Sequence, residues 1–420
     1  MGRTGWIRLL LAGLIGTIAA GAIGLARHPS TPATHAALTL TAPVRMFSQR
    51  LDEAAVKATS RAQWARISRE NTIVVLNSWD SRLIPVLKDA NPRVQVWVYK
   101  NLSGIRSDDC TTATGQCGSC PQGVADSTFL SSGMGYCWVR HNHPSWLLRA
   151  AGTRQPLEFQ GYPRIWETDY GNHAYQRQWI RNVLADVRDH GWDGVDVDNA
   201  LTTADAYGLA SKYPTNAAVQ AATYSALRIV GRALRHAGVA SVFNVGYATT
   251  FPGLWERWLR QVAGLEQEFY LSFFTQPSAA GSTWAAYEAE VLSCVTQHKS
   301  CWFHTGGHMA SVTPRTRGYA LASYLLAADS RQLLALGSGT PISRTPCWVL
   351  GRPLGPAYRV GAASRRDFAG GIALANPSMS RLSVSLGATY FDANEQAVST
   401  VTLGPTSGAV LGATPRPGCH

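Results

Sequence analysis

The stretch GWDGVDVDNA, residues 191–200, places three aspartates in a run that otherwise has the valines and the length of a buried strand. Side chains alternate along a strand, so Val195 and Val197 face one way while Asp196 and Asp198 face the other. Two carboxylates on one strand face repel each other and lose hydration, so core packing alone does not favour them. The stretch therefore predicts that this face binds a positive group or performs acid–base chemistry.

Outside this stretch, short β-rich runs alternate with segments that have helical periodicity. One such segment, AYQRQWIRNVLADVRDHG at 174–191, spaces its apolar residues as an amphipathic helix does and ends at Gly191. The candidate strands are residues 72–78, 93–99, 163–167, 193–198, 240–246, 264–270, 300–304 and 331–337. Eight strands separated by helices predict an α/β fold, a parallel (β/α)8 TIM barrel with right-handed crossovers.

The pattern divides the chain into three parts. We expect the barrel over residues 37–344, with a cysteine-rich loop insertion at about 103–154. After Pro341, apolar and polar residues alternate between Gly, Asn and Pro turns without an intervening helix. Residues 345–420 are therefore predicted to form a small C-terminal antiparallel β unit.

The N-terminus carries the signature of an export signal. Arg3 and Arg8 precede 18 uncharged residues, LLLAGLIGTIAAGAIGLA, and a Pro/Thr/Ala-rich linker follows. Residues 1–36 are thus predicted to be a secretory signal peptide, or alternatively a membrane anchor, plus a linker. Either one predicts a secreted or extracytoplasmic protein.

In an exported protein the eight cysteines are expected to form disulfides, because an oxidising compartment favours them. We expect the pairs Cys294–Cys301 and Cys347–Cys419. Four more are expected to pair among themselves, in an order that the spacing leaves open: Cys110, Cys117, Cys120 and Cys137. The alternative is a zinc site at Cys117-x-x-Cys120, although the usual second half of such a site is missing.

Charge and composition limit the classes of binding partner that we expect. The net charge of +12 would attract an anionic cell envelope or polymer. Nucleic acid is not expected, because the chain has neither a run of Lys and Arg nor a recognisable binding module. The 14 Trp and 15 Tyr suit both a core and sugar-stacking platforms. We expect a monomer without a cofactor.

Acidic residues on two predicted strands indicate the chemistry. In a barrel of this kind the active site lies at the carboxyl ends of the strands. The fourth strand ends at Asp198, and the sixth places Glu266 and Glu268 on one face. Glycoside hydrolysis needs one carboxyl group on each side of the scissile bond. Asp198 and Glu268, nearest the strand ends, are the predicted catalytic pair, and Asp196 and Glu266 are supporting or alternative acids.

Other strand ends supply aromatic faces for a sugar ring and polar groups for its hydroxyls. The predicted substrate-binding residues are Trp79, Asp80, Tyr99, Lys100, Trp166, Asp169, Asn199, Tyr247, Tyr270 and His304. No metal ligand is predicted. The Asp196-Val-Asp198 pair could alternatively serve a metal-dependent enzyme, and chelator sensitivity would reveal that. His304 and His308 have zinc-helix spacing, but two glycines between them argue against a helix.

Several of these motifs together resemble a known family. The segments are YKNLSG, WETDYGNHAYQRQW, GWDGVDVDNA, RRDFAGGIALANPS and GPTSGAVL. As a set, over residues 70–412, they resemble hypothetical glycosyl hydrolase family 15. More distantly, the chain is similar to the endo-α-1,4-polygalactosaminidases of glycoside hydrolase family 114. In that family an Asp ending the fourth strand and a Glu on the sixth act as the pair, which implies Asp198 and Glu268 here.

The sequence thus predicts an exported glycoside hydrolase that cleaves a poly- or oligosaccharide by a two-carboxylate mechanism, with retention favoured by analogy. The alternative is a non-catalytic carbohydrate-binding barrel on the cell surface. In that case Asp198 and Glu268 would lie too far apart, or one of them would be tied to a buried arginine.

Overall fold

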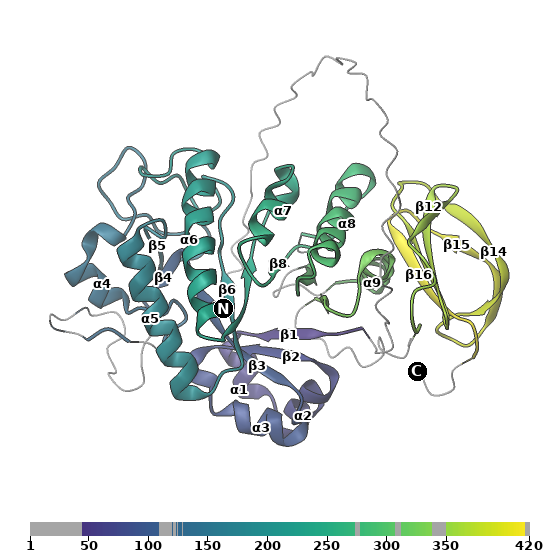
Figure 1. Ribbon diagram of the computed structural model, residues 1–420, viewed down its shortest axis with the longest axis horizontal. Coiled ribbons are helices and arrows are strands. Elements are labelled where there is room, and N and C mark those ends of the chain that lie inside the picture. The colour runs from purple at the N-terminus through teal and green to yellow at the C-terminus, as the bar shows by residue number, and fades with distance from the viewer. Residues whose placement is uncertain are drawn as a thin grey trace, which may run out of the picture. The chain divides into compact units, whose positions relative to one another are not determined.

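Eight parallel strands form a barrel at the centre of the protein (Figure 1). The computed structural model describes residues 44–108, 120, 123, 125–127, 129–273, 278–306, 312–337 and 350–415. In spatial order the barrel strands are β1 (Phe47–Arg50), β2 (Ile73–Leu76), β3 (Gln95–Asn101), β6 (Gly194–Asp198), β7 (Ala240–Asn244), β8 (Leu265–Gln267), β9 (Trp302–Thr305) and β10 (Leu333–Leu336). A parallel bridge between Met46 and Leu334 joins the two edges. The predicted fold class is confirmed.

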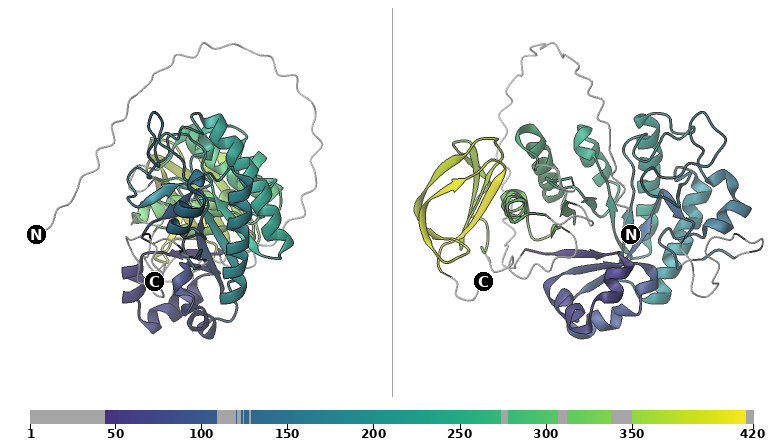
Figure 2. Two further views of the ribbon diagram at one scale, coloured as in Figure 1. Left: turned by 90° about the vertical axis from the view of Figure 1, so that its left-hand side faces the viewer. Right: turned by 180° about the vertical axis from the view of Figure 1, so that it is seen from behind.

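Helices connect successive strands and cover the outside of the barrel (Figures 1 and 2). They are α1 (Glu53–Ala58), α2 (Arg61–Glu70), α3 (Leu83–Ala90), α5 (His173–His190), α6 (Asn216–His236), α7 (Leu254–Leu259), α8 (Gly281–Thr296) and α9 (Pro314–Ala327). Local sequence sets their ends: the Asn172 side chain caps α5, and Gly191 ends it with a φ of 73°. Because β6, β7, β8 and β9 pair in parallel, their carboxyl ends lie on the same side of the barrel.

One predicted barrel strand is wrong and one real strand was missed. Residues 163–167 do not enter the barrel; β5 (Ile165–Glu167) pairs instead with β4 (Gly104–Arg106) in a two-stranded antiparallel sheet. The missing strand is β1, whose four residues FSQR are too short and too polar to show a strand pattern. The two errors compensate in number, so β6 and β8 are the fourth and sixth barrel strands, as predicted.

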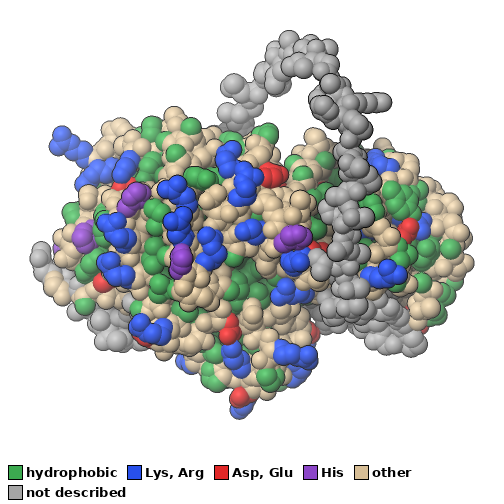
Figure 3. All heavy atoms as spheres, viewed as in Figure 1, with side chains coloured by type: hydrophobic (Ala, Val, Ile, Leu, Met, Phe, Trp, Pro, Cys, Tyr) green, Lys and Arg blue, Asp and Glu red, His purple; other side chains and the backbone are tan. Residues whose placement is uncertain are grey.

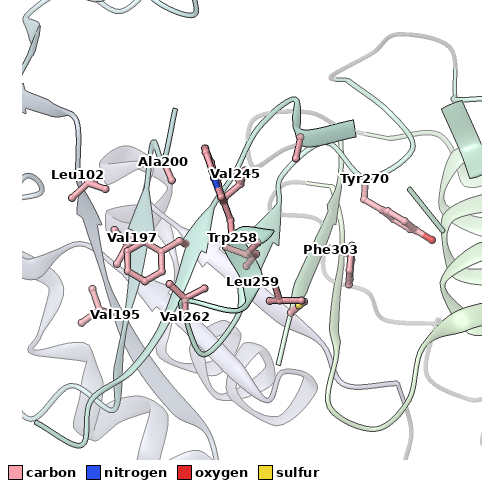
Figure 4. Close-up of a cluster of buried hydrophobic side chains, with 14 of the residues drawn as sticks. Leu102, Val195, Val197, Ala200, Val245, Trp258, Leu259, Val262, Tyr270 and Phe303 are labelled. Atoms are coloured by element: carbon pink, nitrogen blue, oxygen red, sulfur yellow. The ribbon is translucent and has the colours of Figure 1, made fainter. Parts of the chain in front are cut away.

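Alternation along the strands separates the two faces of the barrel. Val195 and Val197 of β6 point outward into the core beneath the helices, with Val262 and Trp258 (Figure 4). The inward side chains at the amino ends of the strands form a separate apolar plug. In this plug the Trp302 ring lies 4.7 Å from Phe47 and 4.8 Å from Trp97, measured between ring centroids. The polar residues of the site lie above this plug.

A six-stranded antiparallel sheet follows the barrel and curves on itself (Figure 2). Its order is β11 (Tyr358–Val360), β12 (Ala363–Phe368), β13 (Gly371–Asn376), β16 (Ser407–Gly412), β14 (Leu382–Phe391) and β15 (Ala397–Leu403). Helix α9 packs against β13 and β16, and Ala373 and Ala375 belong to the same apolar cluster as the barrel core. The exact limits at residues 36 and 344 stay predictions.

Two disulfides are present in the described part of the chain. Cys294 and Cys301 are bonded, as predicted, and fasten the end of α8 to the start of β9. Cys120 is bonded to Cys137, within the predicted group of four, and is therefore not free to bind zinc with Cys117. Cys110, Cys117, Cys347 and Cys419 lie outside the described residues, as does the predicted export segment 1–36. Among the described helices, none has both the length and the apolar character needed to cross a bilayer.

Candidate active site

Asp198 is the last residue of β6 and holds its carboxylate at the carboxyl end of the barrel. Its Oδ1 accepts from the Asn199 backbone N–H at 2.7 Å and from Asn244 Nδ2 at 2.9 Å. Its Oδ2 accepts from the Tyr99 hydroxyl at 2.5 Å and from Asn199 Nδ2 at 3.1 Å. Asn199 reaches both oxygens because its backbone adopts a left-handed φ of 59°, which Asn tolerates better than most residues. Four donors therefore fix the orientation of this carboxylate.

Glu268 follows β8 directly and faces Asp198 across Asn244. The same amide nitrogen that donates to Asp198 Oδ1 also donates to Glu268 Oε2, at 2.8 Å. Since neither oxygen is more than 2.9 Å from that nitrogen, the two oxygens are separated by no more than twice this distance. Asp198 and Glu268 are both half-buried, so solvent and ligands reach them. The structure thus brings the predicted pair together.

A second pair of acids lies one layer deeper, as predicted. Asp196 and Glu266 are fully buried, and Gln49 Nε2 donates to Asp196 Oδ2 at 2.8 Å and to Glu266 Oε1 at 3.1 Å. Burial and the charge of Asp198 raise the pKa of Asp196, and burial and the charge of Asp196 raise the pKa of Glu266. Two buried carboxyl groups this close do not both ionise readily, so the pair retains a proton at neutral pH.

His304 lies on β9 at the edge of this buried layer. Its Nδ1 is 3.9 Å from Glu266 Oε1, and its ring contacts Phe47 edge-on at 5.6 Å between centroids. Only 2% of its surface is exposed. His304 therefore supports the deep acids rather than offering a surface to a sugar.

Aromatic side chains surround the half-buried pair. The Tyr207 hydroxyl donates to Asn199 Oδ1 at 2.8 Å, and its ring stacks on Phe159 at 4.1 Å between centroids. Burial, together with the charges of Asp198 and Glu268, raises the pKa of Tyr207 and keeps its hydroxyl protonated. The exposed Tyr162 ring meets the Tyr207 ring edge-on at 5.6 Å between centroids, and burial and the charges of Glu268 and Asp198 raise the pKa of Tyr162.

On the side of β8, Tyr247 joins two phenylalanines in an exposed aromatic group. Its ring centroid is 6.3 Å from that of Phe269 and 6.0 Å from that of Phe273, and these two are 4.5 Å apart. Burial and the charges of Tyr162 and Glu268 raise the pKa of Tyr247. Together with Tyr162 and Tyr207, these rings form what we call the aromatic rim.

Three predicted substrate-binding residues are engaged elsewhere. Lys100 is fully buried on the outward face of β3, with its Nζ 2.5 Å from Asp186 Oδ2 of α5. Asp169 is buried and accepts from Lys212 Nζ at 2.5 Å, and also from the Tyr213 hydroxyl. Tyr270 is buried as well and donates to Glu288 of α8 at 2.7 Å. In each case the polar group of the side chain is occupied by a partner outside the four acids of the site.

For three more of the predicted residues, the structure records no contact with the acids of the site. Trp79 and Asp80 belong to a short 3₁₀ helix, Ser78–Asp80. Burial raises the pKa of Asp80, and the nearby charge of Arg82 offsets part of that rise. Trp166 lies on β5 and stacks on Tyr136 at 5.7 Å between centroids. Of the predicted substrate-binding residues, Tyr99, Asn199 and Tyr247 gather around Asp198 and Glu268, and His304 lies below them.

Three residues of this site were not predicted from the sequence: Asn244, Gln49 and Tyr207. Asn244 could have been predicted, because it ends the fifth barrel strand and its side chain faces the barrel interior. Gln49 was not, because β1 itself was not recognised. Tyr207 comes from the loop between β6 and α6, where no periodicity marks a side chain as inward. Among the described residues, no group of three or more His, Cys, Asp or Glu side chains is arranged to hold a metal ion.

Residues 88–372, more than half of the chain, match the family described as hypothetical glycosyl hydrolase family 15. The chain belongs to this family. Membership places the protein among the glycoside hydrolases, as the sequence predicted. No curated protein is significantly similar to the chain in sequence.

Solved structures with a comparable arrangement include other glycoside hydrolases. The glycoside hydrolase domain of PelA from Pseudomonas aeruginosa is 11% identical and aligns over 71% of this chain and 96% of its own, with a TM-score of 0.42. Ega3 from Aspergillus fumigatus is 12% identical over 71% and 93%, with a TM-score of 0.39. An α-amylase from Malbranchea cinnamomea is 11% identical over 88% and 96%, with a TM-score of 0.48. Similarity at this level carries no information on substrate or mechanism.

Proposed function

We propose that the protein is an exported, retaining glycoside hydrolase acting on a poly- or oligosaccharide, with Asp198 as nucleophile and Glu268 as general acid and base. The observation that carries the proposal is the single Asn244 nitrogen that contacts both carboxyl groups. The limit that this contact sets on the distance between two of their oxygens supports the roughly 5–5.5 Å between the carboxyl groups of retaining enzymes over the roughly 6.5–9.5 Å of inverting ones. A separation in this range favours direct attack by one carboxylate.

The hydrogen bonds support this division of roles. Asp198 accepts from four donors, which stabilise its anionic form and aim its oxygens. Burial and the Asp198 charge raise the pKa of Tyr99 well above its ordinary value, so Tyr99 remains a donor to this anion. Glu268 faces Asp198 across the same Asn244 amide, and we assign it the complementary role of carrying the proton. That proton is available for the leaving oxygen.

In this mechanism one Asp198 oxygen attacks the anomeric carbon while Glu268 gives its proton to the departing sugar oxygen. Glu268, now anionic, then removes a proton from the water that hydrolyses the glycosyl ester on Asp198. The aromatic rim supplies the flat apolar faces on which sugar rings stack. The disulfides Cys294–Cys301 and Cys120–Cys137 support export, because the cytosol keeps thiols reduced. The proximity of Asp198 and Glu268 disfavours the non-catalytic binding barrel.

The test is reducing-sugar release from a panel of bacterial and fungal envelope polysaccharides. We expect Asp198→Asn and Glu268→Gln each to reduce release by at least about 10³-fold, because each removes a group from the reacting centre. Asp205→Asn is the matched control, since Asp205 is an exposed acid near Tyr247 and outside the pair. Circular dichroism checks the fold of each variant, and proton NMR of the first product reports its anomeric configuration.

Each outcome has a distinct meaning. An inverted first product would contradict direct attack by Asp198. Full activity of Glu268→Gln with loss in Glu266→Gln would move the acid role to the deeper residue. Binding of a polysaccharide without any release, equal in wild type and both variants, would favour a binding barrel and refute the enzyme.

A further inference from the structure

A basic surface covers the outer faces of α5 and α6, away from the active site. Figure 3 shows Lys, Arg and His side chains gathered over these two helices, with few acidic ones. Arg177 and Arg181 of α5 and Arg228 and Arg232 of α6 are all exposed. The two helices are neighbours, since Ser225 Oγ lies 3.5 Å from His173 Nε2. These residues, with Arg235 and His236, form what we call the basic face.

The basic face is poorly neutralised by the protein itself. Helix α6 contains no Asp or Glu, and the exposed Asp189 of α5 is already paired with Arg188 at 2.8 Å. Within the described part of the chain, Arg177, Arg228 and Arg232 have no acidic partner within 4.0 Å. Such a cluster of like charges costs electrostatic energy in the free protein. An anionic partner would remove that cost.

The cluster has a shape that suits an anionic group. Arg228, Arg232 and His236 follow one another at four-residue spacing and, with Ile229 and Ala233, line a surface hollow of about 300 Å³. Positive charge continues beyond α6, where burial and the nearby charge of Arg235 lower the pKa of Lys299. Arginines spaced along a helix in this way can pair with successive charges of an extended polymer.

The α6 residues of the basic face lie toward the end of the barrel opposite the active site. Arg228, Arg232 and His236 lie in the second half of α6, and β7 begins at Ala240 immediately afterwards. They therefore lie toward the amino end of the barrel strands, whereas Asp198 and Glu268 lie at the carboxyl end. A polymer bound here leaves the site open.

We propose that the basic face is a docking surface for an anionic polysaccharide, which holds the enzyme on its matrix while the active site remains free. A membrane is disfavoured, because none of the exposed large apolar side chains recorded in the structure lies on α5 or α6, and interfacial helices insert such residues. The proposal does not depend on the catalytic assignment.

The test measures binding of the protein to polygalacturonate, with neutral dextran as the reference polymer, by biolayer interferometry. The variant Arg177→Gln/Arg228→Gln/Arg232→Gln removes three charges from the basic face. The control Arg61→Gln/Arg69→Gln/Arg93→Gln removes three exposed arginines from α2 and the turn before β3. We expect at least about tenfold weaker binding for the first variant and less than about twofold for the second, with wild-type binding declining as salt rises.

Three results would overturn the proposal. Equal losses in both variants would mean that net charge alone drives binding. Tighter binding to vesicles containing phosphatidylglycerol than to polygalacturonate would assign the basic face to a lipid surface. Binding to dextran as strong as to polygalacturonate would remove the role of charge. Thermal unfolding of each variant confirms that a loss of binding is not a loss of fold.

Discussion

Asn244 is the residue through which the two half-buried carboxyl groups are coupled. Its amide nitrogen donates to Asp198 at 2.9 Å and to Glu268 at 2.8 Å, and only 7% of its surface is exposed. Asn244→Leu keeps the volume and removes both donors. Hydrogen bonds to charged groups contribute about 1.5–3 kcal/mol, so we expect kcat to fall by about 10–100-fold.

The measurement is steady-state kinetics on whichever polysaccharide the wild type cleaves, together with the pH profile of kcat. A positioning role predicts a lower kcat, a nearly unchanged KM and a shifted pH profile, because the amide no longer donates to either carboxyl group. Asn199→Leu is a useful comparison, since it removes one donor to Asp198 and none to Glu268, together with the acceptor of the Tyr207 hydroxyl. An unchanged pH profile in Asn244→Leu would contradict the coupling role.

Lys100 shows where residue-level prediction failed. Tyr99 and Lys100 are adjacent on β3, so only one of them can face the barrel interior, and it is Tyr99. Lys100 instead pairs with Asp186 at 2.5 Å with no exposed surface. Lys100→Met removes this cation from the buried Asp186, which keeps Ser78, Trp192 and His190 as neighbours, and loss of one partner of a buried ion pair costs about 3–5 kcal/mol.

We therefore expect Lys100→Met to lower the free energy of unfolding by that amount while KM stays unchanged in whatever protein remains folded. Chemical denaturation and kinetics on the same preparation separate the two effects. Lys57→Met is the control, because the Lys57–Glu53 pair is exposed and such pairs contribute less than about 1 kcal/mol. A stable variant with a raised KM would restore Lys100 to the substrate site.

At the scale of elements, strands were predicted from the sequence best where the segment is long or fully buried. Strands β3 and β6 are inside continuous apolar or alternating runs, and both were recognised. Strand β1 is four residues long and three of its side chains are only partly buried, so its composition resembles a loop. Strand β5 has the composition of a barrel strand, but its partner β4 lies in the insertion. Strand pairing is a long-range property that local composition does not encode.

The contact between α9 and β16 is the element-scale feature that ties the antiparallel sheet to the barrel. A Cβ added at Gly408 would lie 2.5 Å from the Ala322 Cβ and 3.0 Å from the Gly318 carbonyl oxygen. The backbones of the two elements therefore approach as closely as glycine permits. Gly408→Ala is expected to lower the free energy of unfolding by about 1–3 kcal/mol, as overpacking does.

Gly404→Ala, in the turn between β15 and β16, is the matched control, because its nearest neighbouring atom, Ser407 Oγ, would be 3.9 Å from the new Cβ. Urea denaturation of the two variants against wild type gives the difference. Equal effects would show that the loss of glycine, and not the clash with α9, is responsible. A stable Gly408→Ala would mean that α9 and β16 do not pack this closely.

The molecule as a whole buries acids that its folded state keeps protonated. Burial raises the pKa of Glu167, Glu288 and Glu290 from 4.5 to about 8. Glu288 accepts from the Tyr270 hydroxyl at 2.7 Å and Glu290 from Gln267 at 3.0 Å, and these bonds only partly offset the burial. In the unfolded chain the same groups ionise near their ordinary values.

Between about pH 5 and pH 8 the folded protein therefore binds more protons than the unfolded chain, and its stability falls as the pH rises. One such group contributes a slope of up to about 1.4 kcal/mol per pH unit. Glu288→Gln keeps the oxygen that accepts from Tyr270 but does not ionise, so the decline between about pH 5 and pH 8 becomes shallower by up to that amount. Urea unfolding across this pH range measures the effect, with Glu53→Gln on the surface as the control expected to keep the wild-type slope. If Glu288→Gln keeps that slope too, the Glu288 carboxyl is ionised in the folded protein and the interior around α8 is more polar than its packing implies.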